Sequence, residues 1–233
     1  MEKTKRRRIN KVATVEQVIS HFKDGSSIMY GGFGGIGNPP TIINAILEKG
    51  VKDLTLIGND AGFPHIGIGK IVSEGRAKKL IASHIGSNPV AGQLMTDGKL
   101  DVEFSPQGTL AERIRAGGVG LEGILVDVGV GSMVEEGKQK IVVGGKECLL
   151  ETPLKADVAI VYAKKADTFG NLIYDTSARN TSPLVAMAGT YTIAEVEEIV
   201  PAGELDPECI VTPGVFVDMV IQTEGVNWKW AWE

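Results

Sequence analysis

Cysteine is scarce in this sequence, and its scarcity narrows the classes of protein that the chain can belong to. The 233 residues include only two cysteines, Cys148 and Cys209, and these form neither a metal-binding spacing nor a disulfide framework. A reducing cytoplasm is therefore the expected location. His65 and His84 have no second histidine, cysteine or acid at ligand spacing, so no metal site is expected.

Long apolar runs and an excess of positive charge are also missing. No apolar stretch approaches the length that crosses a membrane, so no membrane contact is expected. The formal net charge of −5 argues against nucleic acid as the main partner. Basic residues gather in an arm at residues 1–13, and no hydrophobic segment follows, so this is not a signal peptide. We expect a flexible, solvated arm, with a regulatory contact to nucleic acid as the alternative.

The rest of the composition is that of a globular protein rich in glycine. Hydrophobic residues make up 43% and charged residues 23%, and there are 30 glycines, which indicates many tight loops. A chain of this length can bury one good core. We expect a single domain over residues 14–225 and a separate tail at 226–233.

The clearest local pattern lies between Asp24 and Pro40. Ser27–Tyr30 is an apolar run of strand length, and five of the next seven residues are glycine. Asn38 can cap a helix, Pro39 fits its first position, and residues 41–48 carry a helical pattern. A strand thus leads into a glycine loop and then a helix N-terminus, an arrangement that offers backbone amides to an anionic group.

The residues alone leave this loop open to a tight turn without a ligand or to a dinucleotide-binding loop. Gly32, Gly34 and Gly37 satisfy the G-x-G-x-x-G spacing of dinucleotide-binding proteins. In that fold, however, the helix begins near the second glycine, and Pro39 and Pro40 would then interrupt its hydrogen bonds. The prolines indicate a later helix start. A Walker A loop is excluded, because no Gly-Lys-Ser/Thr follows.

Two further loops follow predicted strands and carry neutral amide side chains. Asn59 follows a strand at 53–57, and open α/β sheets place their sites in such loops; a plain Gly/Asn turn is the alternative. Gln107 lies on a loop between a strand at 100–104 and a helix at 110–116, which Thr109 can cap. An amide in that position can donate to a developing oxyanion, or merely stabilise a turn.

The order of the elements predicts the fold class. Strands and helices alternate over residues 14–116, which is typical of a three-layer α/β/α fold with a mostly parallel sheet. Short β-like pieces alternate with glycine turns over residues 123–152, and we interpret them as a small β excursion that covers one end of the sheet. Further strands at 157–163, 172–174, 190–194 and 215–221 complete the sheet.

The glycine loop is part of a longer motif that resembles the signature of the family I coenzyme A transferases, on the alpha side. The family pattern is Asp/Asn, Gly/Asn, two free positions, three apolar residues, Gly-Gly-Phe, three free positions and Gly-x-Pro, and residues 24–39 meet every fixed position. Tyr30 replaces the usual aliphatic residue, which we interpret as a packing variant. Residues 105–118 and 177–180 are also similar to the family.

The resemblance implies an enzyme that moves coenzyme A between a short-chain acyl-CoA or 3-oxoacyl-CoA and a carboxylic acid by a ping-pong mechanism. The family has this α/β fold, uses coenzyme A as a substrate without a permanently bound cofactor, and usually acts on acetate, butyrate or acetoacetate. Its nucleophilic glutamate lies on a beta subunit, and none of the Glu-Gly pairs here has that motif. A beta subunit, in an α2β2 or larger assembly, is therefore the expected partner.

The resemblance also assigns roles to site residues. It places Gly31, Gly32 and Gln107 at the active centre, as donors to the oxyanion. It assigns binding of the substrate and coenzyme A to Phe33, Gly34, Gly35, Gly37 and Asn59. The alternative function is a dinucleotide- or sugar-phosphate-binding α/β protein that acts alone.

The last residues hold three tryptophans at every second position, Trp228, Trp230 and Trp232. This period places the three indoles on one face of an extended strand. Exposed aromatic residues at that density predict a partner surface, and a frayed tail is the alternative.

Overall fold

The structure, a computed structural model, describes residues 10–225. The tryptophans of the tail and the first nine residues of the basic arm lie outside the described residues. Residues 10–13 pack on the body: Val12 forms a parallel bridge with Val220, and Lys11 Nζ donates to the carbonyls of Gly214 and Val217 at 2.5 and 2.6 Å. Residues 10–13, which we expected in the basic arm, thus contact the body.

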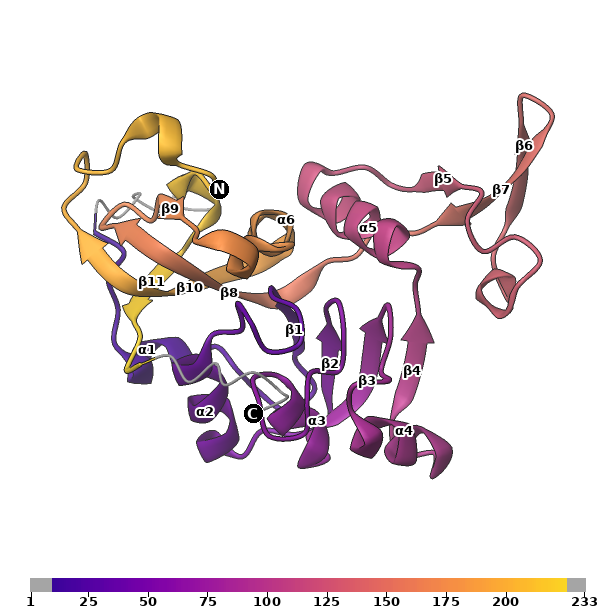
Figure 1. The fold of residues 1–233 in the computed structure, drawn as a ribbon, viewed down its shortest axis with the longest axis horizontal. Helices are drawn as coiled ribbons and strands as arrows, with labels where there is room; N and C mark the ends of the chain where they lie inside the picture. Colours follow the sequence, from indigo (N-terminus) through magenta and orange to yellow (C-terminus); the bar gives the residue numbers. More distant parts are fainter. Residues whose placement is uncertain (1–9, 226–233) are drawn as a thin grey trace, which may run out of the picture.

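A mostly parallel sheet occupies the centre of the described chain (Figure 1). Within residues 10–225 it has eight strands in the order β11-β10-β8-β1-β2-β3-β4, with β9 paired to β8. All neighbours in that order are parallel, and only β9 is antiparallel. The strands are β1 (Ser27–Tyr30), β2 (Leu54–Ile57), β3 (Ala77–Ala82), β4 (Asp101–Phe104), β8 (Ala156–Asp167), β9 (Leu172–Ile173), β10 (Gly189–Val200) and β11 (Met219–Gln222).

Helices cover both faces of this sheet and complete three layers. Figure 1 shows α1 to α4 on one side and α5 and α6 on the other. Two apolar cores separate the layers, and β1 contributes to both: Ile28 and Tyr30 pack with the first group of helices, and Met29 packs with the second. The helices are α1 (Val15–Ile19), α2 (Pro40–Lys49), α3 (Gly69–Ser73), α4 (Pro89–Thr96), α5 (Gln107–Val119) and α6 (Ser182–Ala188).

The fold class and the element order predicted from the sequence are confirmed. The elements expected over residues 14–116 are present, with ends that shift by less than one helical turn. Thr14 forms the predicted capping box with Gln17 at the start of α1. No helix of the described chain is long and apolar enough to cross a membrane.

The predicted cap of α2 is wrong. Asn38 makes no capping hydrogen bond, and the helix begins at Pro40. A residue far along the chain takes over this role: the carboxylate of Glu195, on β10, accepts the amides of Thr41 and Ile42 at 3.0 Å each. These are first-turn amides that have no partner within their own helix, so a neighbouring strand satisfies the N-terminus of α2.

The predicted start of α5 is also wrong. The helix begins at Gln107 after Pro106, so Thr109 is a buried residue of its first turn and not its cap. Proline is tolerated at a helix start because its missing N–H has no helical acceptor there. Gln107 consequently stands on the first turn of a helix, which fixes its backbone, and not on a loop.

The predicted β excursion exists, but it does not cover the sheet. Strands β5 (Ile124–Val126), β6 (Lys140–Val143) and β7 (Lys146–Glu151) form a separate antiparallel sheet in the order β5-β7-β6. Figure 1 shows it projecting from the body beyond α5. From here on, the arm means residues 124–151, and the segment at residues 1–13 is always called the basic arm.

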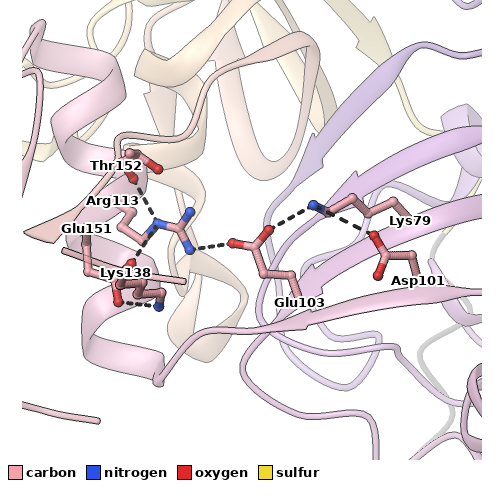
Figure 2. A network of polar contacts seen from close by, with 7 residues as sticks. All are labelled: Lys79, Asp101, Glu103, Arg113, Lys138, Glu151 and Thr152. Carbon is pink, nitrogen blue, oxygen red and sulfur yellow. Dashed lines mark hydrogen bonds and ion pairs between the residues drawn. The ribbon is translucent and has the colours of Figure 1, made fainter. Parts of the chain in front are cut away.

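A chain of charged side chains joins the arm to the body (Figure 2). Arg113 of α5 is central: Nη1 lies 2.9 Å from Glu103 Oε1 on β4, and Nε donates to the Thr152 carbonyl at 2.8 Å. Glu151, at the end of β7, lies 3.6 Å from Arg113 Nε and 2.6 Å from Lys138 Nζ. Arg113 and Glu151 are both buried, so this junction is a desolvated ion network rather than a surface pair.

Glu103 extends the network to the sheet. Its second carboxylate oxygen lies 2.9 Å from Lys79 Nζ on β3. Burial acts to raise the pKa of Glu103, but the hydrogen bonds from Lys79 and Arg113 outweigh it and hold that pKa below its ordinary value. The fold therefore favours the charged form of Glu103.

Candidate active site

Four loops meet at the carboxyl edge of the parallel sheet. They follow β1, β2, β3 and β4, which are successive neighbours in the sheet, so their ends lie side by side. The glycine loop follows β1, between β8 on one side and β2 on the other. Parallel sheets bind ligands at this point, where the order of the strands reverses direction.

Asn59 and Gln107, which are 48 residues apart, are brought into contact in this edge. Gln107 Nε2 donates to Asn59 Oδ1 at 2.7 Å. Ser83 Oγ donates to the Asn59 carbonyl at 2.7 Å and lies 3.2 Å from Asn59 Oδ1. Asn59 is 3% exposed and Gln107 is exposed. The buried Asn59 side chain thus fixes the exposed side chain of Gln107, whose second N–H remains for a ligand.

The backbone of the glycine loop turns back on itself. Phe33 N donates to Ile36 O at 2.9 Å and Ile36 N donates to Phe33 O at 3.0 Å, a miniature hairpin. The side chain of Phe33 is 47% exposed, and its ring centroid lies 5.8 Å from that of His84, which follows β3. An exposed aromatic ring therefore stands at the edge of the site.

Only some amides of the glycine loop are left without a hydrogen-bond acceptor in the described chain. Gly31 N donates to strand β8 at 3.2 Å, and Phe33 N is used within the hairpin. Gly34 N donates to a carboxylate oxygen at 3.0 Å. Among the described residues, the amides of Gly32, Gly35 and Gly37 have no acceptor. Gly32 and Gly35 are the two of these that lie between Gly31 and Gly35, the stretch assigned to the oxyanion.

Two glycines are sterically required. Gly32 has φ +100°, and a Cβ there would lie 2.6 Å from both Asn38 Nδ2 and the Ile36 carbonyl. Gly37 has φ +83°, and its Cβ would lie 2.5 Å from the Ala178 carbonyl. Both the left-handed backbone and the close approach exclude a side chain.

A second copy of the loop lies beside the first, and the sequence reasoning missed it. Gly62-Phe63-Pro64-His65-Ile66-Gly67 after β2 repeats the Gly-Phe-x-x-Ile-Gly of residues 32–37. In both loops the phenylalanine and the isoleucine form a bridge, and a helix follows. The repeated hexapeptide is the sequence pattern from which the two similar loops could have been predicted.

Polar side chains join the two loops in both directions. Asn38 Nδ2 donates to Gly31 O at 2.6 Å, and Asn38 Oδ1 accepts the amide of Ile68 at 2.9 Å. In return, Asp60 Oδ2 accepts the amide of Gly34 at 3.0 Å. Asn38, predicted as a helix cap, is instead buried in this loop junction.

Tyr30, the last residue of β1, also contacts this loop junction. Its hydroxyl donates to the Asp60 carbonyl at 2.5 Å. Burial raises the pKa of Tyr30 well above its ordinary value, and the nearby Asp60 charge adds to the effect. Tyr30 is thus a neutral donor that holds the second loop, and not only the packing variant that the sequence predicted.

Within the described residues, no group of three or more histidine, cysteine, aspartate or glutamate side chains could hold a metal ion. Two buried hydroxyls near the loops, of Ser105 and Ser182, have no hydrogen-bond partner among these residues. Ser105 follows the last residue of β4 and lies two residues before Gln107, and Ser182 packs against Gly31. Apart from the buried Asp60 carboxylate and the His84 ring, the polar side chains described at this edge are amides and hydroxyls, which can bind an oxygen-rich ligand.

Comparison with known proteins decides the family. The family model described as coenzyme A transferase matches residues 12–223. This chain belongs to the coenzyme A transferase family. A probable coenzyme A transferase subunit alpha from Bacillus subtilis is 60% identical over 224 residues, which are 96% of this chain and 98% of the relative. An acetate CoA-transferase subunit alpha from Escherichia coli is 51% identical over 92% of this chain and 97% of the relative. Within the family, this is an alpha-type chain.

Solved coenzyme A transferases share its fold. An acyl-CoA transferase from Escherichia coli O157:H7, in a thioester complex with CoA, superposes with a TM-score of 0.81 at 21% identity. That match covers 95% of this chain and 51% of the other, so the chain spans about half the length of that enzyme. Glutaconate coenzyme A-transferase from Acidaminococcus fermentans gives a TM-score of 0.79 at 23% identity, over 91% of this chain and 75% of that one.

Because the chain belongs to this family, the alternative of a stand-alone dinucleotide-binding protein is no longer needed. The geometry agrees with this outcome, because α2 begins at Pro40, after the last glycine of the loop, and not near its second glycine. Coenzyme A transferases handle coenzyme A as a substrate. The individual roles of Gly31, Gly32, Gln107 and the binding residues stay predictions.

Proposed function

We propose that this chain is the alpha subunit of an enzyme that moves coenzyme A between a short-chain acyl-CoA or 3-oxoacyl-CoA and a carboxylic acid. The observation that carries the proposal is the contact of Gln107 with Asn59, at the same sheet edge as the glycine loop and its amides without an acceptor. The names of relatives support the substrate class: one is an acetate CoA-transferase and another an acetoacetyl-CoA:acetate/butyrate CoA transferase.

In this proposal the nucleophile is a glutamate of a beta subunit. Its carboxylate attacks the thioester carbonyl, and an acyl anhydride forms as the coenzyme A thiolate leaves. The thiolate then attacks the glutamyl carbonyl, which gives a glutamyl-CoA thioester and releases the first carboxylate. A second carboxylate reverses these steps. Asp60 does not fit the nucleophile's role, because it is 2% exposed and its oxygens are occupied by N–H donors.

The alpha subunit's task is to stabilise the tetrahedral oxyanions of these steps. The amides of Gly32 and Gly35 and the remaining N–H of Gln107 are the donors, and a donor of this kind is worth about 3 kcal/mol. Phe33, Gly34, Gly37 and Asn59 line or support the place where the acyl-CoA binds. Coenzyme A enters as a substrate, without a resident cofactor, in an α2β2 or larger assembly in the cytoplasm.

Borohydride trapping tests this proposal. The chain is purified alone and with its beta subunit, incubated with acetoacetyl-CoA, reduced, and each polypeptide is weighed by mass spectrometry. We expect a reduced glutamyl residue on the beta subunit only. A reduced glutamate on this chain would show that the nucleophile lies here instead. No reduced residue in the complex, despite bound acetoacetyl-CoA, would contradict the transferase mechanism.

A further inference from the structure

Asp60 is a buried residue whose carboxylate accepts three hydrogen bonds and whose main-chain carbonyl accepts a fourth. Its Oδ1 accepts the amide of Gly62 at 2.7 Å, and its Oδ2 accepts the amide of Gly34 at 3.0 Å and Asn59 Nδ2 at 3.1 Å. Its main-chain carbonyl accepts the Tyr30 hydroxyl. Among the described residues it has no ion-pair partner, so N–H donors compensate its charge.

The charge of Asp60 dictates how the neighbouring amides are oriented. An ionised carboxylate can only accept, so the Asn59 side chain must turn its nitrogen to Asp60. The oxygen of Asn59 then faces Gln107, which must in turn present its nitrogen at 2.7 Å. The three side chains form a relay in which every N–H points toward the buried charge.

We propose that Asp60 is a positioning residue that sets the direction of this relay and so holds Gln107 as a hydrogen-bond donor in the site. The proposal rests on the function proposed above, in which Gln107 donates to the oxyanion. A neutral residue at position 60 leaves both directions open. With the relay reversed, the Asn59 nitrogen would donate to Gln107 Oε1, and the Gln107 nitrogen would lie on the opposite side of its amide group, out of the position in which Asn59 Oδ1 holds it here.

The same carboxylate orients the glycine loop. Because Asp60 Oδ2 accepts from both Gly34 and Asn59, one oxygen ties the backbone donors of the loop to the side-chain relay. The next amide, of Gly35, has no acceptor among the described residues. Preorganised donors of this kind cost no reorganisation during the reaction.

The first test is Asp60→Asn in the full chain, assayed with its beta subunit. We expect kcat to fall about tenfold or more while KM changes less than about twofold, because the transition state loses more than the ground state does. Asp167→Asn is the matched control: Asp167 is also 2% exposed and accepts the amides of Phe169 and Asn171 and the Asn171 side chain. Its loss should lower Tm without changing kcat. An unchanged kcat in Asp60→Asn would overturn the proposal.

A double-mutant cycle tests the direction of the relay itself. Gln107→Glu alone sets a carboxylate against Asn59 Oδ1, so two acceptors face each other and Tm should fall. Combined with Asp60→Asn, the relay can reverse, and the Asn59 nitrogen can donate to the introduced carboxylate. The Tm loss of the double variant should therefore be smaller than the sum of the two single losses.

The outcomes separate the two proposals. Additive Tm losses would overturn the relay, even if trapping on the beta subunit succeeds. If the losses are coupled but the wild-type complex shows no transferase activity, the result would support the relay and contradict the proposed function. The Tm cycle needs no substrate, so it reads the relay independently of turnover.

Discussion

At the scale of single residues, the site depends on positions where one extra atom or one missing donor has a defined effect. Gly32 is the plainest case, because its φ of +100° and the surrounding backbone both exclude a Cβ. Gln107 is the opposite case: it is exposed, and its proposed role depends on the direction in which its side-chain amide donates a hydrogen bond. The two positions call for different measurements.

Gly32→Ala should lower both stability and turnover. The new Cβ meets Asn38 and the Ile36 carbonyl at 2.6 Å, so the loop must shift. We expect a loss of about 1–3 kcal/mol in unfolding free energy and of about 100-fold in kcat, measured by thermal unfolding and steady-state assay. Gly25→Ala is the control: Gly25 also has a positive φ, of +78°, but a Cβ there would have no atom within 4 Å, and its kcat should stay at the wild-type value.

Gln107→Ala should act on turnover and leave folding nearly intact. Removing an oxyanion donor lowers kcat by about 100-fold or more, and KM should change little. Gln93→Ala is the matched control, because Gln93 is an amide on α4 that donates to Asp97, outside the four loops of the site. A wild-type kcat in Gln107→Ala would remove this residue from the oxyanion assignment.

At the scale of elements, helices start where distant side chains satisfy their first turn. Local pattern placed the start of α2 at Asn38 and Pro39, but Asn38 is used to join the two Gly-Phe-x-x-Ile-Gly loops. Glu195 supplies the missing acceptor from β10, two strands away from β1 across β8. The glycine loop therefore enters a helix that is held by the far half of the sheet.

Glu195→Ala should destabilise the fold through α2. It leaves the buried amides of Thr41 and Ile42 without acceptors, which costs about 1–3 kcal/mol, measured by urea unfolding. Glu198→Ala, on the same strand, removes a carboxylate that is 51% exposed and paired with Lys165, and should cost less than about 0.5 kcal/mol. Equal losses in the two variants would contradict the capping role.

At the scale of the whole molecule, the arm forms a sheet of its own, separate from the parallel sheet. It projects from the body in Figure 1, and the ion network of Figure 2 joins it through Arg113, Glu103 and Glu151. Removing one member leaves a buried charge without its partner, which costs more than a surface pair would. The junction is therefore the place where acid should act first.

Acid should loosen the arm before it unfolds the sheet. The folded pKa of Glu103 lies below its ordinary value of 4.5, so its stabilising effect is complete above pH 4.5 and is lost as pH falls through the lower folded value. Hydrogen exchange, corrected for its intrinsic pH dependence, should show residues 124–151 losing protection before β1 and β2. In Glu103→Gln the arm should be less protected at neutral pH and respond less to acid; a full acid response there would exclude Glu103 as the cause.

The sequence by itself determined the elements, their order and the family. Period-two and helical apolar patterns predicted the α/β alternation, and the spacing of residues 24–39 predicted the coenzyme A transferase motif. These features are local, because propensity and turn chemistry act within a few residues. For the same reason local patterns identified Asn59 and Gln107 only as separate amides on separate loops, and their expected roles came from the family resemblance.

Only the tertiary structure decided which groups meet and which are already in use. It bonded Gln107 to Asn59, occupied three of the five amides from Gly31 to Gly35, and placed Asp60 beneath both loops. It also gave the cap of α2 to Glu195, and set the arm outside the sheet that it was expected to cover. Hydrogen-bond partners are chosen by proximity in space, because a buried donor takes whichever acceptor the packed fold supplies.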